Sequence, residues 1–552
     1  MSIGERIMQL RKEAGLSQEA FAEKLGVSRQ SVSKWESDSA TPDVNKAIAI
    51  CELFGVSSDY LLCGKENPPA PEASIDENFE EKTYEEVYIG EENPEEIYEE
   101  VNEAETAEEK NAKPSRNKKA KIIIAAVLAC CILIAAVIPL SIAGYKKLHA
   151  SSDNPAVVQP SVNESAVVYP YVLVHGMGGW GEGAGINSVS PYWGSSTGSL
   201  SDYLRGEGHL VYEVYVGPFS CAWDRACELY AQLTGTTVDY GAAHSKEHGH
   251  NRYGKEYTTP LYTDWGTKTP GGQLHKINLV GHSFGGTTIR LLATLMEYGS
   301  EAEQNASPDD LSPLFKGGKG NWINSITTLC SPHNGSSLYY VADKGTLISS
   351  MLSLLRVTGG IADKLDSDMI DFQLEHFGIT SDSQDATSLI NKSFMNGKDN
   401  AFYDLSPHGA KELNQSIKTV KSIYYFSYSY CTTEKSKISD NQIPINSTIL
   451  VLKPTATLIG SYTNTADDAP IKIDESWLPN DGLVNVVSAK YPEGESHTDY
   501  TQGMKIEKGI WHVLPTRTGH HGTVIGMDGN TQETHEFYTN LITMINALPR
   551  IK

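Results

Sequence analysis

The chain has few cysteines and no surplus of basic charge. Only eight of its 552 residues are cysteine, and none belongs to a C-x-x-C pair. This excludes a disulfide-dense scaffold. We expect mostly reduced cysteines that serve as packing residues, and a Cys221–Cys227 bridge stays open. The formal net charge is −24, which excludes a uniformly basic, nucleic-acid-binding surface.

Charge is distributed unevenly along the chain. Residues 66–112 hold 18 acidic and 2 basic side chains, whereas residues 113–150 hold 7 basic and no acidic ones. The acidic stretch is too charged to bury a core and should be disordered. We therefore predict several segments: a first domain over 1–65, an acidic linker with a basic end over 66–121, an apolar segment over 122–144, a stalk over 145–166 and a last domain over 167–552.

The apolar segment is long enough to cross a membrane. Residues 122–144 contain no charged side chain, and 23 residues at about 1.5 Å each span a hydrocarbon layer of about 30 Å. More basic residues precede the segment than follow it, which places the N-terminal side in the cytoplasm. The sequence thus predicts a single transmembrane helix, with the chain in the cell membrane and residues after 150 outside.

The first 65 residues show the pattern of short amphipathic helices. Ile3, Ile7 and Leu10 form a helical stripe that Gly15 ends, Ser17 is a candidate cap of a second helix, and a third helix is expected over 29–36. The string LSQEAFAEKLGVSRQSVSKWE resembles the Cro/repressor-type helix-turn-helix family, over about residues 3–62.

This resemblance implies an all-α, DNA-binding domain. The third helix can reach base edges and phosphates in a major groove through polar residues near its start: Arg29, Gln30, Ser31, Ser33 and Lys34. Val32 is better placed to pack against the preceding helix. The domain is nearly neutral and adjoins an acidic linker, which weakens non-specific DNA binding. A protein-binding role for the same fold is the alternative.

A buried strand followed by a glycine-rich turn occurs twice in the last domain. Residues 168–174 run into His175-Gly-Met-Gly-Gly179, and residues 276–280 run into Gly281-His-Ser-Phe-Gly285, after which 287–296 have a helical pattern. A G-x-S-x-G between strand and helix is typical of a nucleophile elbow, where glycines permit a strained, closely packed turn. The pattern predicts an α/β-hydrolase domain with Ser283 as the nucleophile.

A serine nucleophile needs a base and an acid that orients the base. In the α/β-hydrolase order both follow the serine. Asp481, at a predicted strand edge, is the candidate acid, and His520 and His521 are two candidate bases. The N–H groups of Met177 and Phe284 are the candidates for an oxyanion hole.

Residues from about 168 to 548 resemble the zinc-containing secreted lipases of bacilli and staphylococci. The motifs that carry the resemblance are 223–232, 238–250, 331–335, Tyr403-Asp-Leu with 409–414, and 480–482. It implies hydrolysis of lipid esters by a triad of Ser283, Asp481 and His521. His521 is preferred over His520 because it aligns with the family's histidine, which stands five residues before the glycine of Val-Ile-Gly.

The same resemblance implies a structural zinc ion in a subdomain inserted before the nucleophile. Its ligands fall on Asp224, His244, His250 and Asp399, and two imidazoles with two carboxylates suit a closed tetrahedral site. The family also has a calcium site, but here a glutamate position holds Thr523. Losing one of two carboxylates weakens such an oxygen site, so calcium is not predicted.

The predicted fold class is thus multidomain: a helical DNA-binding domain, one transmembrane helix and an α/β-hydrolase domain with an inserted zinc subdomain. The expected function is a membrane-anchored, outward-facing serine ester hydrolase, similar to triacylglycerol lipases, with a cytoplasmic DNA-binding domain. The alternative is a one-component transmembrane regulator whose lipase-like outer domain senses lipids or esters. The expected partners are a lipid or ester substrate, the membrane and DNA.

Overall fold

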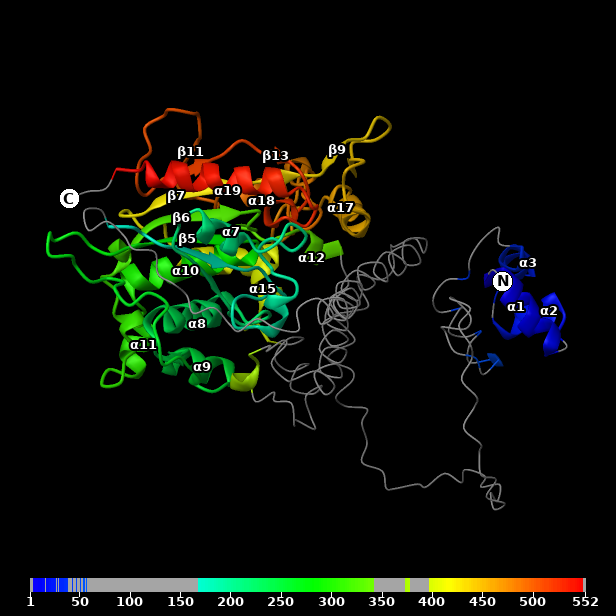
Figure 1. Cartoon of the computed structure of the whole chain (residues 1–552), viewed down its shortest axis with the longest axis horizontal. Coiled ribbons are helices and arrows are strands. Elements are labelled where there is room, and N and C mark those ends of the chain that lie inside the picture. Colours follow the sequence, from blue (N-terminus) through cyan, green and yellow to red (C-terminus); the bar gives the residue numbers. More distant parts are fainter. Residues whose placement is uncertain are drawn as a thin grey trace, which may run out of the picture. The chain divides into compact units, whose positions relative to one another are not determined.

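The computed structural model describes residues 167–341, 373–377 and 397–549, and residues 3–37 with short gaps, followed by scattered positions up to 56. The chain divides into two compact units, Met1–Lys110 and Asn111–Lys552. Figure 1 labels many of the described elements of each unit.

The prediction of a transmembrane helix is wrong for this structure. Within the described residues, no helix is both long and apolar enough to cross a membrane. Residues 122–144, on which the prediction rested, lie outside the described residues, as do the predicted linker and stalk. A charge-free run has the length and polarity of a span, but those properties alone do not establish one. The fold class is corrected to a helical domain and an α/β-hydrolase-like domain, and the single-pass membrane localisation is withdrawn.

The N-terminal unit begins with three short helices, α1 (Ile3–Glu13), α2 (Gln18–Lys24) and α3 (Arg29–Glu36). The Ser17 hydroxyl accepts a hydrogen bond from the Ala20 N–H at 3.1 Å, as expected of a helix cap. The helices share a small apolar core. Its buried members are Ile7, Leu10, Phe21, Ala22, Leu25, Val32, Trp35 and Ile50.

A seven-stranded sheet forms the centre of the second unit, in the order β11-β12-β7-β6-β5-β1-β2. Every pairing in it is parallel. The strands are β1 (Tyr171–Val174), β2 (Val211–Val214), β5 (Ile277–His282), β6 (Ile323–Leu329), β7 (Tyr424–Tyr428), β11 (His497–Asp499) and β12 (Trp511–Val513).

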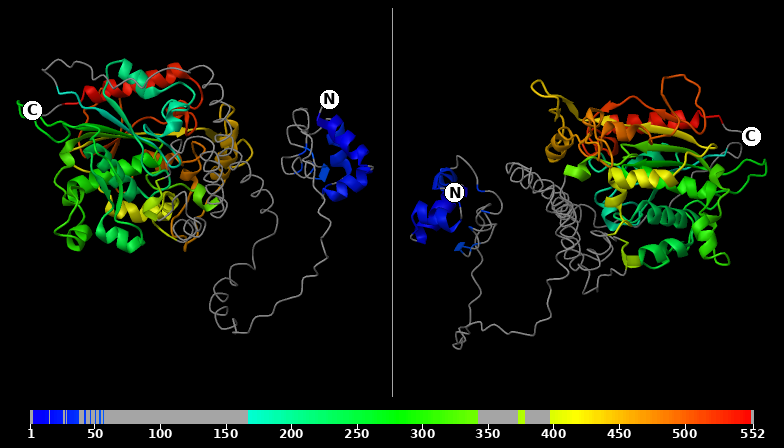
Figure 2. Two further views of the ribbon diagram at one scale, coloured as in Figure 1. Left: turned by 60° about the horizontal axis from the view of Figure 1, so that its bottom comes forward. Right: turned by 180° about the vertical axis from the view of Figure 1, so that it is seen from behind.

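Helices cover both faces of this sheet (Figures 1 and 2). On one face lie α8 (Ala222–Thr234) and α10 (Phe284–Tyr298), and on the other α7 (Leu200–Gly206) and α19 (Thr531–Asn546). Alternate residues of a strand therefore belong to different cores: Val172 and Leu279 to one, Leu173 and Val280 to the other. Burial on both faces explains why neither β1 nor β5 carries an acidic or a Lys/Arg side chain and why most of their residues are apolar.

The order of the strands reverses between β1 and β5. From β1 the chain moves outward to β2, then returns to the other side of β1 with β5 and proceeds outward again through β6 and β7. Loops at such a reversal diverge at the carboxyl ends of the strands and leave room for a ligand there. The two glycine-rich turns predicted from the sequence follow these two strands.

Shorter elements surround the sheet. A hairpin of β3 (Thr237–Asp239) and β4 (Tyr253–Glu256) encloses α9 (Ala242–His248) and forms the insertion between β2 and β5. The others are α11 (Glu301–Ala306), α12 (Leu338–Val341), α15 (Ala401–Leu405), α16 (Pro407–Ser416), α17 (Lys453–Ile459), α18 (Val486–Lys490), β8 (Tyr430–Cys431), β9 (Thr433–Lys435), β10 (Gln442–Pro444) and β13 (Arg517–Thr518).

Candidate functional site

Ser283 lies on the turn between β5 and α10 in a strained backbone conformation. Its φ is 54° and its ψ is −128°, a region that residues other than glycine rarely occupy. The neighbouring glycines are required by contact. A Cβ on Gly281 would lie 2.5 Å from the carbonyl carbon of Gly285, and one on Gly285 would lie 2.1 Å from the carbonyl oxygen of Val174. The turn therefore holds Ser283 tightly against the end of β1.

Asp481 and His521 form a buried pair near the carboxyl end of the sheet. The His521 Nδ1 lies 2.8 Å from the Asp481 Oδ2, and the His521 backbone N–H donates to the Asp481 carbonyl, also at 2.8 Å. The other carboxylate oxygen accepts from the N–H groups of Leu483 at 3.0 Å and Val484 at 2.7 Å. Both the position and the orientation of the carboxylate are thus determined by hydrogen bonds.

Two details of this pair differ from, or go beyond, the sequence prediction. Asp481 does not sit at a strand edge but in a turn closed by an isolated bridge between Asn480 and Asn485. Of the two candidate histidines, His521 is the one that contacts Asp481. The His520 ring instead accepts from the Gly522 N–H at 3.2 Å, and its Nε2 has no hydrogen-bond partner among the described residues.

The His521 ring lies beside the elbow, next to the residue that precedes the serine. The centroids of the His521 and His282 rings are 4.8 Å apart. Within residues 167–341 and 397–549, no hydrogen bond joins the Ser283 hydroxyl to the His521 ring. Such bonds are often long in ligand-free hydrolases and shorten when substrate binds.

Two backbone N–H groups next to Ser283 have no acceptor among the described residues. In the loop after β1, the N–H of Gly176 donates to the Tyr192 hydroxyl at 2.9 Å and that of Gly178 to the Pro218 carbonyl at 2.9 Å. The intervening Met177 N–H makes no such bond. Phe284 is the first residue of α10, so its N–H lacks an intrahelical acceptor. Both N–H groups are available to an anion near Ser283.

A buried arginine that sequence reasoning did not single out supports this loop. The Arg225 guanidinium donates to the Gly217 carbonyl and to the Thr288 hydroxyl, each at 2.9 Å, and to the His175 carbonyl. It thereby connects the loops after β1 and β2 to α10. Burial lowers the pKa of Arg225 to about 10, so it stays charged at neutral pH. Its only signal in the sequence was its place in the Trp-Asp-Arg motif.

Four side chains converge at a second place, beside the inserted hairpin. The His244 Nε2 lies 3.2 Å from the Asp224 Oδ1 and 3.4 Å from the Asp399 Oδ1, and the His250 Nε2 lies 3.3 Å from the Asp399 Oδ2. These atoms are buried and make no hydrogen bond within the described residues. Buried polar atoms that face one another in this way, from two imidazoles and two carboxylates, fit a metal ion such as zinc.

The electrostatics of this cluster, defined by Asp224, His244, His250 and Asp399, favour a cation. Burial acts to lower the pKa of His244, but the carboxylates of Asp224 and Asp399 outweigh it and raise that pKa to about 10. Burial acts to raise the pKa of Asp399, yet His244 and His250 hold it well below its usual range. The two buried carboxylates therefore attract positive charge, which a proton on His244 or a bound cation can supply.

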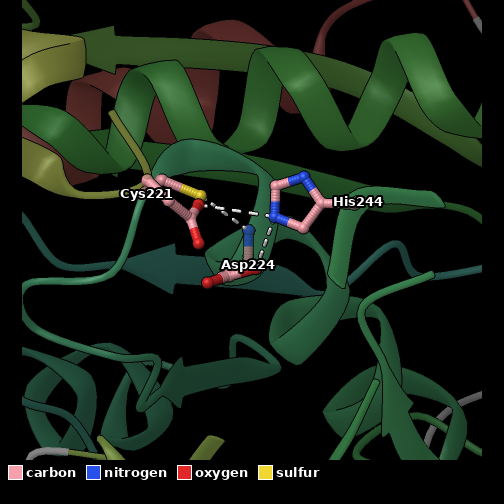
Figure 3. Close-up of side chains that lie close together, drawn as sticks. Cys221, Asp224 and His244 are labelled. Atoms are coloured by element: carbon pink, nitrogen blue, oxygen red, sulfur yellow. Dashed lines mark hydrogen bonds and ion pairs between the residues drawn. The ribbon is translucent and has the colours of Figure 1, made fainter. Parts of the chain in front are cut away.

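Helix ends position the members of the cluster. His244 lies on α9, whose start is capped by the Glu303 carboxylate, an acceptor for the N–H groups of Ala243 at 2.9 Å and His244 at 2.8 Å. Asp224 lies in the first turn of α8, where the Cys221 sulfur accepts its N–H at 3.3 Å. Figure 3 shows Cys221 and Asp224 beside the His244 ring.

His376 is a further neighbour that no spacing in the sequence indicated. Its Nε2 lies 3.1 Å from the Asp224 Oδ2, whereas His244 lies against the Oδ1 of the same carboxylate. The His376 carbonyl accepts the Asn251 N–H at 2.9 Å. Cys221 also contributes a sulfur atom close to the cluster. Cys221 and Cys227 are both free and buried, so the bridge that the sequence left open is not formed in this structure.

In the N-terminal unit, α3 presents its polar residues to solvent. Arg29, Gln30, Ser33 and Lys34 are exposed and Ser31 is half-buried, whereas Val32 and Trp35 belong to the core. Arg29 pairs with Glu19 of α2 at 2.9 Å, with both side chains largely exposed.

A buried ion pair that the sequence did not reveal orients α3. The Arg11 Nη2 lies 3.0 Å from the Glu36 Oε2, which also accepts from the Gln18 amide at 2.9 Å. Burial acts to raise the pKa of Glu36, but the hydrogen bonds from Arg11 and Gln18 lower it below its ordinary value. One carboxylate thus joins α1, α2 and α3.

A parallel sheet covered on both faces, with a serine on a strained turn after a central strand, defines an α/β-hydrolase-like domain. Residues 167–549 match the family described as Lipase-like, C-terminal domain, and residues 7–61 match the Helix-turn-helix family. The chain belongs to the lipase-like family and carries an N-terminal helix-turn-helix domain.

Individual relatives agree with this assignment. Lipase 1 of Staphylococcus aureus (strain MRSA252) is 34% identical over 382 residues, which are 67% of this chain and 53% of that protein. This chain therefore matches only about half the length of its curated relatives. The structure of EstA from Clostridium botulinum is similar with a TM-score of 0.61 at 35% identity, covering 73% of this chain and 93% of that one. For lipase 1 from Pelosinus fermentans the TM-score is 0.59 at 37% identity, covering 70% and 100%.

Proposed function

We propose that the chain is a carboxylic ester hydrolase of the lipase type, with Ser283 as nucleophile, His521 as base and Asp481 as the acid that orients the base. The observation that carries the proposal is the buried Asp481–His521 pair, at 2.8 Å, next to a serine on a strained turn. The names of its relatives, Lipase 1 and EstA, support an ester or lipid substrate.

The chemistry begins with a proton transfer. As the Ser283 Oγ bonds to the ester carbonyl carbon, the His521 Nε2 takes its proton, and the carbonyl electron pair moves onto oxygen. The N–H groups of Met177 and Phe284 stabilise this oxyanion. Asp481 accepts from the His521 Nδ1–H, which keeps Nε2 free to accept and stabilises the imidazolium.

The second half of the cycle releases the products. The oxyanion reforms the carbonyl, the bond to the alcohol oxygen breaks, and His521 returns its proton to that oxygen. Water then attacks the acyl-serine by the same route: His521 takes the water proton and passes it to the Ser283 Oγ as the acid leaves. His521 thereby transfers one proton in each half of the cycle, first from Ser283 to the alcohol and then from water to Ser283.

Hydrolysis of p-nitrophenyl esters by the purified full chain tests this proposal. We expect activity on a series from butyrate to palmitate, and a loss of at least about a thousandfold in kcat for Ser283→Ala. Ser436→Ala, in an exposed turn, is the matched control and should keep full activity. Wild-type activity in Ser283→Ala would show that another residue is the nucleophile.

A structural zinc ion is the second part of the proposal. Asp224, His244, His250 and Asp399 would hold the ion, and when bound it supplies a crosslink between α8, the inserted hairpin and the start of α15. Ligands that lie far apart in the sequence close long loops, so binding adds to the free energy of folding. Elemental analysis tests it directly. We expect one zinc per chain and a lower melting temperature after chelation or in His250→Ala, whereas less than a tenth of an equivalent, with no stabilisation by added zinc, contradicts it.

Sequence-specific DNA binding by the N-terminal domain is a separate function, favoured by the exposed polar residues of α3. Selection from a random DNA pool, followed by fluorescence anisotropy at several salt concentrations, tests it with the full chain. Arg29→Ala with Gln30→Ala should abolish enrichment of a sequence, whereas Lys246→Ala on α9 removes one charge elsewhere and should change nothing. Failure to enrich any sequence would favour a protein partner for this domain.

A further inference from the structure

Tyr192 lies between the loop after β1 and the elbow. It is buried, and its hydroxyl accepts the Gly176 N–H at 2.9 Å. The same hydroxyl lies 2.6 Å from the Nδ1 of His282, the residue before the nucleophile. One phenol oxygen thus contacts both of the turns that enclose the reacting atoms.

His282 extends the connection to the loop that carries the base. Its Nε2 lies 3.0 Å from the His521 carbonyl oxygen. A carbonyl can only accept, so Nε2 must carry the proton. Burial holds the pKa of His282 well below its usual range, so the ring is neutral and Nδ1 has a free lone pair. The Tyr192 O–H therefore donates to Nδ1, and every donor in the series has an acceptor.

This directed series of hydrogen bonds joins three loops that the chain supplies far apart in the sequence. It runs from the Gly176 N–H through Tyr192 and His282 to the His521 carbonyl. The His521 N–H then continues it to the Asp481 carbonyl at 2.8 Å. Gly176 precedes Met177, whose N–H is assigned to the oxyanion in the proposed mechanism, and His282 precedes Ser283. A shift in any one loop would break a bond in this series.

We propose that Tyr192 and His282 are positioning residues that hold the Met177 N–H, Ser283 and His521 in the geometry needed for ester hydrolysis. The inference rests on the function proposed above and adds two residues to it. Neither side chain touches the reacting atoms in this scheme. Misplacing a reacting group by about 1 Å can cost about a hundredfold in rate, so small displacements of these loops are sufficient to matter.

Tyr192→Phe tests the hydrogen bonds separately from the packing. The ring contacts His175, Trp180 and Trp193 at centroid distances of 5.7, 5.8 and 5.7 Å, and phenylalanine preserves these contacts. Only the hydroxyl is lost, which leaves the Gly176 N–H and the His282 Nδ1 unpaired. We expect kcat for p-nitrophenyl butyrate to fall about tenfold to a hundredfold, with KM changed less than about threefold.

The chain offers a closely matched control in Tyr425→Phe. Tyr425 is also buried, and its hydroxyl accepts a backbone N–H, that of Val420, at 2.9 Å. Tyr425 lies on β7 and belongs to none of the three loops that the hydrogen-bond series joins. Its loss of a hydroxyl should also lower stability, because it leaves the Val420 N–H unpaired, while leaving kcat unchanged.

Two further readouts separate positioning from folding. Titration with diethyl p-nitrophenyl phosphate counts the chains whose Ser283 is reactive, so that kcat is expressed per active site. An alkyl boronic acid forms a tetrahedral adduct with the serine, and it should bind Tyr192→Phe more weakly by about the same factor as kcat falls. His282→Gln keeps an amide donor toward the His521 carbonyl and should retain more activity than His282→Leu, which keeps none.

The outcomes distinguish the two levels of the proposal. Activity that survives in Ser283→Ala overturns the proposed function. If Ser283→Ala is inactive, a Tyr192→Phe enzyme with kcat within twofold of wild type overturns the positioning role alone. A fall in activity matched by an equal fall in titratable sites also overturns it, because the hydroxyl would then serve folding only. If the His282 variants do not fold, the Tyr192→Phe and Tyr425→Phe pair decides.

Discussion

Asp481→Asn is the substitution whose effect follows most directly from the geometry of the site. Asparagine has nearly the same shape, and its amide oxygen can still accept from the Leu483 and Val484 N–H groups, which now bond to the Asp481 Oδ1. The amide NH2 then faces the His521 Nδ1. Since an NH2 group can only donate, the ring must keep Nδ1 unprotonated and carry its proton on Nε2.

The expected loss is large because the wrong tautomer removes the base. With a proton on Nε2, His521 has no lone pair for the Ser283 proton, and the negative charge that stabilises the imidazolium is gone. In Ser-His-Asp hydrolases this exchange lowers kcat by about 10⁴-fold, equivalent to about 5.5 kcal/mol of activation free energy. Folding should change by less than about 1 kcal/mol, because the backbone hydrogen bonds of the turn remain.

Steady-state hydrolysis of p-nitrophenyl butyrate, together with urea unfolding, measures both quantities. Asp474→Asn is the control: this exposed aspartate accepts the Ser476 N–H at 2.9 Å and is remote from the chemistry, so its substitution should leave kcat unchanged. A loss of less than about tenfold in Asp481→Asn, with stability unchanged, would refute the reasoning, because His521 would then keep its tautomer without the carboxylate.

Three further predictions follow from other contacts. Gly285→Ala places a Cβ 2.1 Å from the Val174 carbonyl oxygen and should destabilise the second unit by about 3 kcal/mol or prevent its folding, which thermal unfolding measures; an unchanged melting temperature would contradict the contact. His376→Gln should weaken zinc binding about tenfold to a hundredfold in a chelator competition, while His408→Gln, half-exposed on α16, should not; equal affinities would show that His376 does not support Asp224. Burial raises the pKa of Glu213 to about 7, so between about pH 4.5 and 7 the folded chain binds more protons than the unfolded one, and the free energy of unfolding falls as pH rises, by up to about 3 kcal/mol. Urea unfolding at pH 5 and 7.5 should show a smaller fall in Glu213→Gln than in the wild type. An identical fall would contradict the raised pKa of Glu213.

Local signals in the sequence predicted the three N-terminal helices and the turn that carries Ser283. The three N-terminal helices begin and end close to the expected residues, because caps and breakers act over a few positions: Ser17 precedes α2, and α3 covers 29–36 as predicted. The elbow was equally readable, since its glycines are needed for contacts within the turn and with β1. The resemblance, more than any spacing, associated Asp224 with His244, His250 and Asp399.

Contacts between distant segments were not readable. Arg225, Tyr192 and His376 act through carbonyls, hydroxyls and rings that only the folded chain brings near. Apart from the Trp-Asp-Arg motif that contains Arg225, nothing in the neighbouring sequence marks them. The buried Arg11–Glu36 pair could not be predicted either, because charged residues on short helices are usually solvent-exposed. The transmembrane prediction failed for a different reason: it relied on hydropathy and flanking charge alone, and no helix of the described residues supports it.

The order of strands in the sheet has a consequence for synthesis of the chain. β1, β2, β5 and β6, with Ser283, come from residues before 330, whereas β7, β12, Asp481 and His521 come from residues after 423. A ribosome adds about 5–20 residues per second, so about 12–48 seconds separate the emergence of Ser283 from that of His521. The β6 edge stays unpaired until β7 emerges, and Ser283 lacks its proposed base until His521 follows. The proposed triad is therefore complete only once residues up to His521 have been synthesised, so Ser283 can act only after the turns that carry Asp481 and His521 have joined the sheet.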